Sequence, residues 1–246
     1  MQDFAPDSPL AAALPSPNHG DRGEQVPRAI VLHYTGMATG AAALERLRDP
    51  AAQVSAHYVV EEDGRIFQLV PEARRAWHAG KSFWAGETDM NSTSIGIEIV
   101  NGGHDFGSPP YPDVQIAAVI ALCRDIARRH AIPARRILAH SDIAPGRKAD
   151  PGELFPWAQL AAAGIGHYVT PHRLGGDPPL TLGAEGEEVA NLQRDLAAYG
   201  YGVVISGRYD AETETAVAAF QRHFRPARVD GKADLSTLYT LRDLLA

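Results

Sequence analysis

Residues 140–152 are the part of this chain whose residue types and spacing best suit chemistry. They hold His140, Lys148 and Asp150 on a stretch interrupted by prolines and glycines. The run at residues 136–139 predicts a short buried strand, so we expect His140 at a strand end and the other two residues on the following loop. Residues two apart in an extended loop point the same way. A histidine and a carboxylate are half of a catalytic zinc site, which needs three protein ligands and an open position.

A second histidine and a second carboxylate stand at comparable positions. The apolar run 29–32 predicts a buried strand that ends at His33. Residues 94–101 alternate, so that three isoleucines share one face and Gly96, Glu98 and Val100 share the other. Glu98 is therefore a carboxylate within an apolar strand, where a carboxylate is seldom buried without a partner. Each residue alone could be a packed or ion-paired side chain, but together they are the parts of a zinc hydrolase.

Five motifs extend this pattern along the chain: HYTG at 33–36, SAHYVV at 55–60, AWHAG at 76–80, SIGIEIVN at 94–101 and HSDIAPGRKADPG at 140–152. In this order they resemble the zinc-dependent N-acetylmuramoyl-L-alanine amidases of the second amidase type, which share a fold with the peptidoglycan recognition proteins. The resemblance covers roughly residues 15–165. The last motif is highly specific, whereas HYTG alone would be weak.

The resemblance implies a role for each of these residues. His33, His140 and Asp150 would bind Zn²⁺. Glu98 would be the general base, and Lys148 would stabilise the oxyanion of the tetrahedral intermediate. The bond cut would join the lactyl group of N-acetylmuramic acid, or of its 1,6-anhydro form, to L-alanine. Five further motif residues are candidates for substrate contact: His57, Tyr58, Trp77, His78 and Asn101. For Trp77, a role in the core is an equal alternative.

Two alternative functions stay open at this stage. A non-catalytic peptidoglycan-binding or sensing protein can use the same fold, but members that only bind typically lack the full ligand set that this chain has. A zinc peptidase acting on the stem peptide is the second alternative. The chain has no H-E-x-x-H motif of such peptidases, and an analysis of products would decide.

Composition argues against other classes of protein. A net charge of −7 disfavours nucleic acid as a partner, and no stretch approaches the ~18 apolar residues of a membrane span. The single Cys123 falls on the apolar face of a predicted helix, which indicates packing and no disulfide. We expect a monomer that binds peptidoglycan or an anhydromuramyl peptide. Because the first residues have no export-signal pattern, we expect a cytoplasmic location, with the periplasm as the alternative.

The predicted fold is α/β: a mixed central β-sheet flanked by helices, plus a small C-terminal three-helix domain. We divide the chain into an irregular lead-in at 1–28, a catalytic domain at 29–165, a linker at 166–179 that is rich in proline and glycine, and a peptidoglycan-binding domain at 180–246. Expected strands cover residues 29–33, 57–61, 66–70, 95–100 and 137–140. Expected helices cover residues 40–48, 112–130 and 157–163.

The last segment contains an internal repeat. The pattern G-x-x-D-x-x-T occurs twice at an offset of 24 residues, and Asp210 and Asp234 stand where the N-caps of two helices belong. An amphipathic helix is expected before them at residues 187–199. The segment resembles the peptidoglycan-binding module often appended to wall hydrolases.

Overall fold

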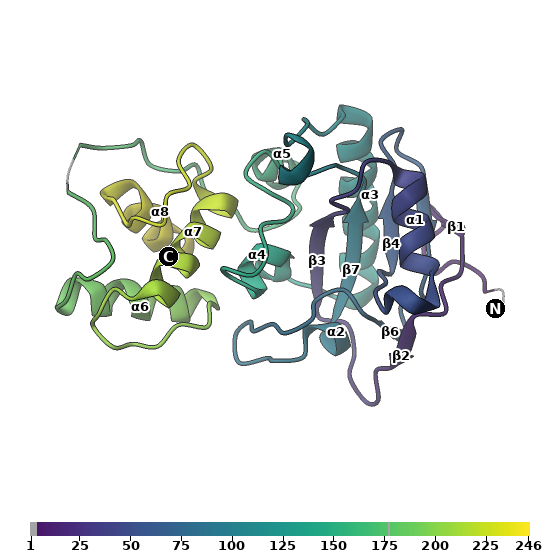
Figure 1. Cartoon of the computed structure of the whole chain (residues 1–246), viewed down its shortest axis with the longest axis horizontal. Helices are drawn as coiled ribbons and strands as arrows, with labels where there is room; N and C mark the ends of the chain where they lie inside the picture. The colour runs from purple at the N-terminus through teal and green to yellow at the C-terminus, as the bar shows by residue number, and fades with distance from the viewer. Residues whose placement is uncertain (1–3, 177) are drawn as a thin grey trace.

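A six-stranded sheet forms the centre of the larger part of the molecule in the computed structural model, which describes residues 4–176 and 178–246 (Figure 1). Neighbouring strands pair in parallel except β4 and β5, which form a hairpin. The predicted mixed α/β sheet is thereby confirmed. The strands in spatial order are β1 (Ala12–Ala13), β5 (Ile66–Gln68), β4 (Tyr58–Val60), β7 (Ser94–Ile99), β3 (Ala29–Tyr34) and β8 (Ile137–Ala139).

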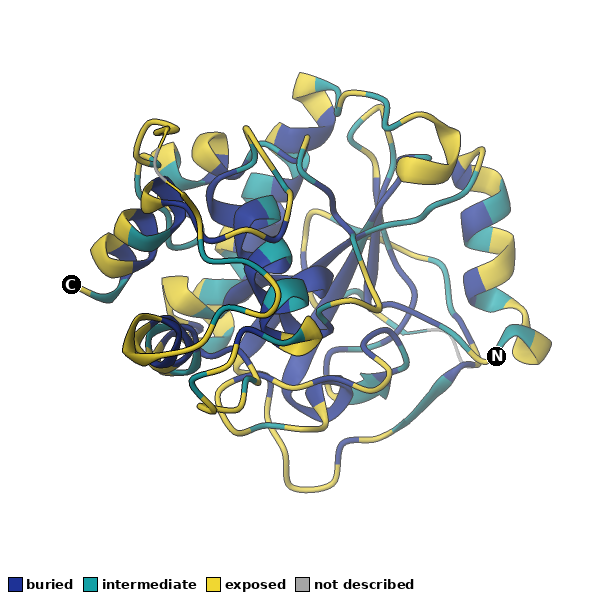
Figure 2. Ribbon diagram, turned by 60° about the vertical axis from the view of Figure 1, so that its left-hand side comes forward, coloured by how far each residue is buried: buried dark blue, intermediate teal, exposed yellow. Residues whose placement is uncertain are grey.

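The two faces of the sheet have different covers. Helix α3 (Asp113–His130) packs its apolar side, which includes Cys123, against the isoleucines of β7. Helix α1 (Gly40–Arg48) lies over the other face, where Leu47 joins Val59 and Val100 in a smaller cluster. The central strands β4, β7, β3 and β8 are almost wholly buried (Figure 2). Both helices begin and end within one residue of the predicted positions.

The alternation predicted for residues 94–101 decides which face carries polar groups. The three isoleucines of β7 point toward α3, while Gly96 and Glu98 point to the opposite face. Strand β3 lies between β7 and β8, with His33 directly opposite Glu98 and Leu32 opposite Ala139. Because paired residues of neighbouring strands share a face, this register gathers the polar side chains on the face that α3 does not cover.

The N-terminal lead-in is more regular than the sequence predicted. Strand β1 adds to the sheet beside β5, and β2 (His19–Asp21) pairs with β6 (Arg74–Ala76) in a separate two-stranded sheet. Strands of two and three residues are too short to show a hydrophobic period, which is why the prediction of an irregular segment was wrong here. Residues 1–3 of that segment lie outside the described residues.

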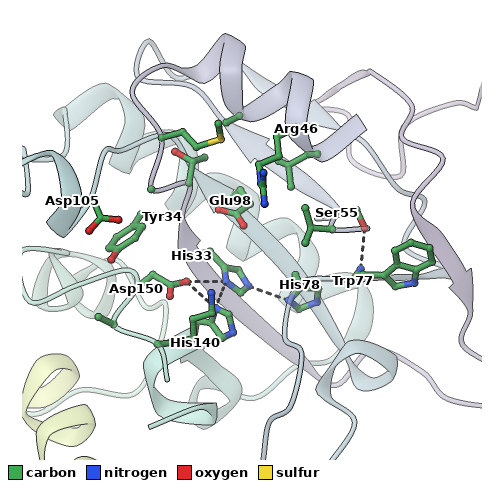
Figure 3. A pocket seen from close by; sticks show the side chains of 18 of the residues that line it. His33, Tyr34, Arg46, Ser55, Trp77, His78, Glu98, Asp105, His140 and Asp150 are labelled. Carbon is green, nitrogen blue, oxygen red and sulfur yellow. Dashed lines mark hydrogen bonds and ion pairs between the residues drawn. The ribbon is translucent and has the colours of Figure 1, made fainter. Parts of the chain in front are cut away.

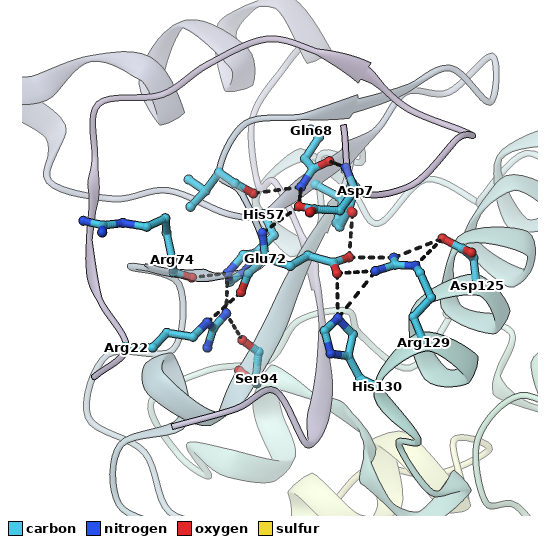
Figure 4. Close-up of polar contacts among 12 residues, drawn as sticks. Asp7, Arg22, His57, Gln68, Glu72, Arg74, Ser94, Asp125, Arg129 and His130 are labelled. Atoms are coloured by element: carbon cyan, nitrogen blue, oxygen red, sulfur yellow. Dashed lines mark hydrogen bonds and ion pairs between the residues drawn. The ribbon is translucent and has the colours of Figure 1, made fainter. Parts of the chain in front are cut away.

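Buried polar contacts fasten the lead-in to the domain (Figure 4). Asp7 accepts hydrogen bonds from the Glu72 backbone N–H and the Gln68 amide. Arg22 is buried and donates to backbone carbonyls, including that of Glu72. The Glu72 carboxylate in turn accepts from Arg129 at 2.7 Å and from Tyr58 and His130 at 2.6 Å. The two buried ionic groups of this network, Arg22 and Glu72, therefore both have partners, as their burial requires.

The C-terminal part consists of three helices, as predicted. Asp210 and Asp234 are the N-caps of the second and third of these helices, accepting from the N–H groups of Thr213 and Thr237 at 2.8 Å each. The linker of residues 166–179 runs outside regular elements, and its residue 177 lies outside the described residues. Every helix in the described ranges is too short or too polar to cross a membrane. The helices are α6 (Glu187–Tyr199), α7 (Ala211–Phe224) and α8 (Leu235–Leu245).

Glu72 makes the stability of the fold sensitive to acid. Burial raises the pKa of its carboxyl, but hydrogen bonds from Arg129, His130 and Tyr58 outweigh that effect and lower the pKa to about 2. A lowered pKa contributes stability that is present above the unfolded value near 4.5 and is lost as pH falls toward 2. We predict that, between pH 5 and pH 2, the wild type loses about 3 kcal/mol more of its unfolding free energy than the Glu72→Gln variant does.

Denaturant titrations at several pH values measure this difference. The exposed Glu62→Gln is the control and should leave the pH dependence as it is in the wild type. Parallel pH profiles for Glu72→Gln and the wild type would contradict the prediction.

Candidate active site

Three side chains from separate parts of the chain converge on the face of the sheet opposite α3 (Figure 3). His33 ends the buried part of β3, His140 begins the short helix α4 (His140–Ile143) after β8, and Asp150 lies on the following loop. His33 Nδ1 lies 2.8 Å from His140 Nδ1 and 3.0 Å from Asp150 Oδ2, which is 2.9 Å from His140 Nδ1. All three residues are buried. The sequence predicted this meeting of residues 33, 140 and 150.

This donor set fits a zinc ion. Two imidazole nitrogens and a carboxylate oxygen, without a thiolate, are an ordinary ligand set for catalytic zinc. Burial and the neighbouring His140 lower the pKa of His33 to about 4, although Asp150 opposes the shift, so this ring is neutral at pH 7. Nδ1 of His33 and Nδ1 of His140 face each other at 2.8 Å, and a cation shared by the lone pairs of these two nitrogens satisfies both.

Contacts behind the site fix which ring nitrogen faces it. His140 Nε2 lies 3.2 Å from the Ala79 carbonyl, which only accepts, so Nε2 carries the hydrogen and Nδ1 has the lone pair. His33 Nε2 lies 3.0 Å from His78 Nδ1, and His78 Nε2 is 3.3 Å from the Ser94 hydroxyl. When His78 Nε2 donates to Ser94 and His33 Nε2 donates to His78 Nδ1, the lone pair of the His33 ring is on Nδ1, where it is free to bind a metal. Such orientation of ligand histidines is typical of zinc sites.

His78 fits behind His33 only because residue 96 is glycine. A Cβ at Gly96 would lie 2.4 Å from the His78 ring. The His78 ring lines the cavity, so its role in substrate contact stays a prediction. The same ring also contacts His33 and helps to hold it in place. Burial and the neighbouring His33 and His57 lower the pKa of His78 well below its usual value, which keeps its ring neutral.

Glu98 and Lys148 face the same cavity as the three convergent residues. Among the described residues, the buried Glu98 Oε2 has no hydrogen-bond partner. Burial raises the pKa of Glu98 well above its usual value, Asp150 adds to that rise, and Lys148 opposes it. A carboxyl with a raised pKa and a free oxygen can exchange a proton with a bound molecule.

The cavity has a volume of about 540 Å³, within the range of small-molecule sites. Trp77 is half-buried on its wall, so this predicted substrate contact has access to a ligand. Three further residues line the cavity and were not predicted as site residues: Arg46 of α1, His104 and Arg147. His104 contacts the Tyr34 hydroxyl at 3.0 Å. Arg46 and His104 lie outside the family motifs, and an exposed helical arginine has no distinguishing sequence signal.

Three of the predicted substrate contacts lie away from the cavity. His57 is fully buried (Figure 4), with Nδ1 accepting from the Gly96 N–H at 2.9 Å. Tyr58 is fully buried, and its hydroxyl donates to the Glu72 carboxylate at 2.6 Å. Asn101 is 5% exposed and bonds with Gly103 N and Pro109 O. These side chains shape the sheet and the loop at 102–109, and none of the three lines the cavity of the convergent residues, so their contact with a substrate stays a prediction.

Comparison with protein families gives the class of the chain. The family of N-acetylmuramoyl-L-alanine amidases matches residues 23–153, and a peptidoglycan binding domain matches residues 185–241. The chain belongs to the N-acetylmuramoyl-L-alanine amidase family, which confirms the resemblance drawn from the motifs.

Individual relatives agree with this assignment. The N-acetylmuramoyl-L-alanine amidase AmiD of Escherichia coli (strain K12) is 42% identical over 226 residues, which cover 85% of this chain and 79% of that protein. The solved complex of AmiD with the substrate anhydro-N-acetylmuramic acid-L-Ala-D-gamma-Glu-L-Lys has a TM-score of 0.76 at 40% identity and covers 91% of each chain. AmpDh3 from Pseudomonas aeruginosa, in complex with anhydromuramic pentapeptide, has a TM-score of 0.74 at 34% identity and covers 98% of this chain and 97% of that one.

Another relative matches only part of this chain. The 1,6-anhydro-N-acetylmuramyl-L-alanine amidase AmpD of Enterobacter cloacae is 35% identical over 170 residues, which cover 89% of that protein but 62% of this chain. This chain is therefore substantially longer than the part that it shares with AmpD.

Removal of one ligand should abolish metal binding. We predict that His140→Ala binds no stoichiometric zinc after dialysis, because the remaining two donors cannot hold the ion against water. His130→Ala is the control, since His130 is the last residue of α3, bonds to Glu72 and does not line the cavity. Zinc content by inductively coupled plasma mass spectrometry checks this, and one equivalent retained by His140→Ala would show that the ligand set is different.

Proposed function

We propose that this enzyme hydrolyses the amide bond between 1,6-anhydro-N-acetylmuramic acid and L-alanine in soluble muropeptides, with one bound Zn²⁺. The convergence of His33, His140 and Asp150 beside the free oxygen of Glu98 is the observation that carries this proposal. The anhydro-N-acetylmuramic acid peptide that is the substrate in the AmiD complex supports the choice of muropeptide, as does the name of AmpD, a 1,6-anhydro-N-acetylmuramyl-L-alanine amidase.

The chain's own residues supply the proton transfers and the charge that hydrolysis needs. When bound, zinc supplies a Lewis acid and makes a nucleophilic water available near neutral pH. Glu98 takes the proton of the attacking water and delivers it to the leaving nitrogen of L-alanine. The ammonium of Lys148 stabilises the negative charge that develops on the former carbonyl oxygen. The products are a free carboxylate on the lactyl group and a free amino group on the peptide.

Cationic side chains in the cavity can meet the carboxylates of a peptide. Arg46, Arg147 and Lys148 line the cavity together with three acidic residues, Glu98, Asp105 and Asp150. The substrate in the AmiD complex contains a γ-linked glutamate, whose α-carboxylate is free. Arg46 points into the cavity from α1 and is placed to meet such a group (Figure 3).

The binding-only alternative conflicts with the completeness of the site. The proposed ligands, the base and the lysine all line one cavity, which a sensing protein has no need to retain. The action of the C-terminal part on peptidoglycan and the cytoplasmic location both stay predictions, and fractionation of cells that produce the native protein tests the second.

Product analysis is the experiment that tests the proposed function. Purified anhydromuramyl tripeptide is incubated with the zinc-loaded enzyme, and products are identified by mass spectrometry with and without a chelator. We expect free tripeptide and the anhydro sugar, abolished by chelator and restored by zinc. Cleavage within the peptide would show a peptidase, and intact substrate in the presence of bound zinc would contradict the choice of soluble muropeptides.

Lys148 is predicted to act on the rate without holding the metal. Lys148→Ala should lower kcat by about 10²-fold or more, because a charge that acts only in the transition state is lost. Zinc content should be unchanged. Lys81→Ala, which removes an exposed lysine outside the cavity, is the control. Loss of zinc from Lys148→Ala would show instead that the lysine mainly shapes the loop around Asp150.

A further inference from the structure

The C-terminal helices share one hydrophobic core with the amidase part of the chain. This core contains Trp84 and Ile143 from one side and the aromatic residues of α6 and α7 from the other. The Trp84 ring meets the rings of Tyr199 and Tyr201 edge-on at centroid distances of 6.0 and 5.0 Å. The Ala85 N–H donates to the Gly200 carbonyl at 2.9 Å. The two parts are therefore docked, despite the linker composition of residues 166–179.

A buried carboxylate lies at the centre of this junction. Asp142 is fully buried on α4 and accepts three hydrogen bonds. One comes from the Ala139 N–H at 2.8 Å, within its own turn. The other two come from the C-terminal part: the Tyr201 hydroxyl at 2.8 Å and His223 Nδ1 at 2.7 Å. A buried carboxylate is stable only with such donors, so α4 depends on the C-terminal part for two of them.

The donors themselves are held rigidly. The His223 ring stacks between Trp157 and Phe224, with centroid distances of 3.7 Å to each. Since the Asp142 carboxylate only accepts, the His223 ring must donate from Nδ1. Tyr201 is 1% exposed and is held by Trp84 and Phe220. Neither donor can swing away from Asp142 without opening the shared core.

Helix α4 connects this junction to the active site. Its first residue is His140, whose ring faces the site. The Ser141 N–H donates to the Asp150 carbonyl at 3.0 Å, and the Lys148 N–H donates to the Ala144 carbonyl at 3.1 Å. Two proposed zinc ligands and the oxyanion lysine are therefore tied to the same helical turn. A shift of α4 would move all three relative to His33 and Glu98.

From this arrangement we infer that Tyr201 and His223 are positioning residues of the amidase reaction. They act through Asp142 to hold α4, so that the C-terminal helices complete the active site in addition to any binding of peptidoglycan. The inference rests on the proposed function for its kinetic consequence, but its consequence for metal affinity is independent of substrate. Loss of the outer partners of metal ligands typically costs 10- to 100-fold in metal affinity or activity.

Tyr201→Phe tests the inference with little change in packing, because only the hydroxyl is lost. Tyr209→Phe is the matched control: Tyr209 is fully buried in the C-terminal part, and its hydroxyl donates to the Gly231 carbonyl, away from α4. We expect Tyr201→Phe to lower kcat on anhydromuramyl tripeptide, zinc affinity or both by about tenfold or more, with KM changed less than threefold. Tyr209→Phe should affect thermal stability alone.

A pair of substitutions at His223 adds a rescue test. His223→Asn retains a side-chain N–H near the position of Nδ1, whereas His223→Leu removes the donor. We expect the asparagine variant to keep more activity and tighter zinc binding than the leucine variant. If His223→Leu does not fold, the comparison of Tyr201→Phe with Tyr209→Phe still decides.

The outcomes separate this inference from the proposed function. A Tyr201→Phe enzyme with kcat and zinc affinity within twofold of wild type, or with the same loss as Tyr209→Phe, would overturn the positioning role. If wild type itself leaves the tripeptide uncleaved, the proposed function fails, and the zinc dissociation constants of the same variants still test the positioning of α4.

Discussion

The register of three parallel strands is the constraint on which this active site depends. Strand β3 lies between β7 and β8, and its pairing sets His33 opposite Glu98 and Leu32 opposite Ala139, one residue before His140. A slip of one residue in either pairing would turn the affected side chains to the face covered by α3. The apolar packing of α3 against the sheet therefore secures the site by making every other register unfavourable.

Buried polar groups add orientation to the position that the sheet provides. The Ala79 carbonyl and the His78 ring decide which nitrogens of His140 and His33 face the site. The Asp142 carboxylate joins the turn that starts at His140 to the C-terminal helices. Each of these groups lies at the end of a strand or within a short turn, where backbone hydrogen bonds alone do not fix side-chain direction. Orientation in this enzyme thus comes from a layer of contacts behind the site.

Sequence patterns were sufficient for the centre of this structure. Strand-end histidines and the mid-strand Glu98 could be located because alternation and apolar runs are local signals. The same motifs could not separate His78, which lines the cavity, from His57, which is fully buried and does not line it, because both are motif histidines next to short strands. Asp142 gave no signal, since its partners lie 59 and 81 residues further along the chain. The composition of the linker indicated separate domains, whereas the shared core depends on long-range packing around Trp84.

The central claim is that one zinc ion binds to Nδ1 of His33, Nδ1 of His140 and the carboxylate of Asp150. A crystal of the zinc-loaded protein, measured on both sides of the zinc absorption edge, tests it directly. We expect a single anomalous peak within bonding distance of these three groups, about 2.0–2.2 Å from the donor atoms. A peak bound through Nε2 of either histidine, or one located away from these residues, would contradict it.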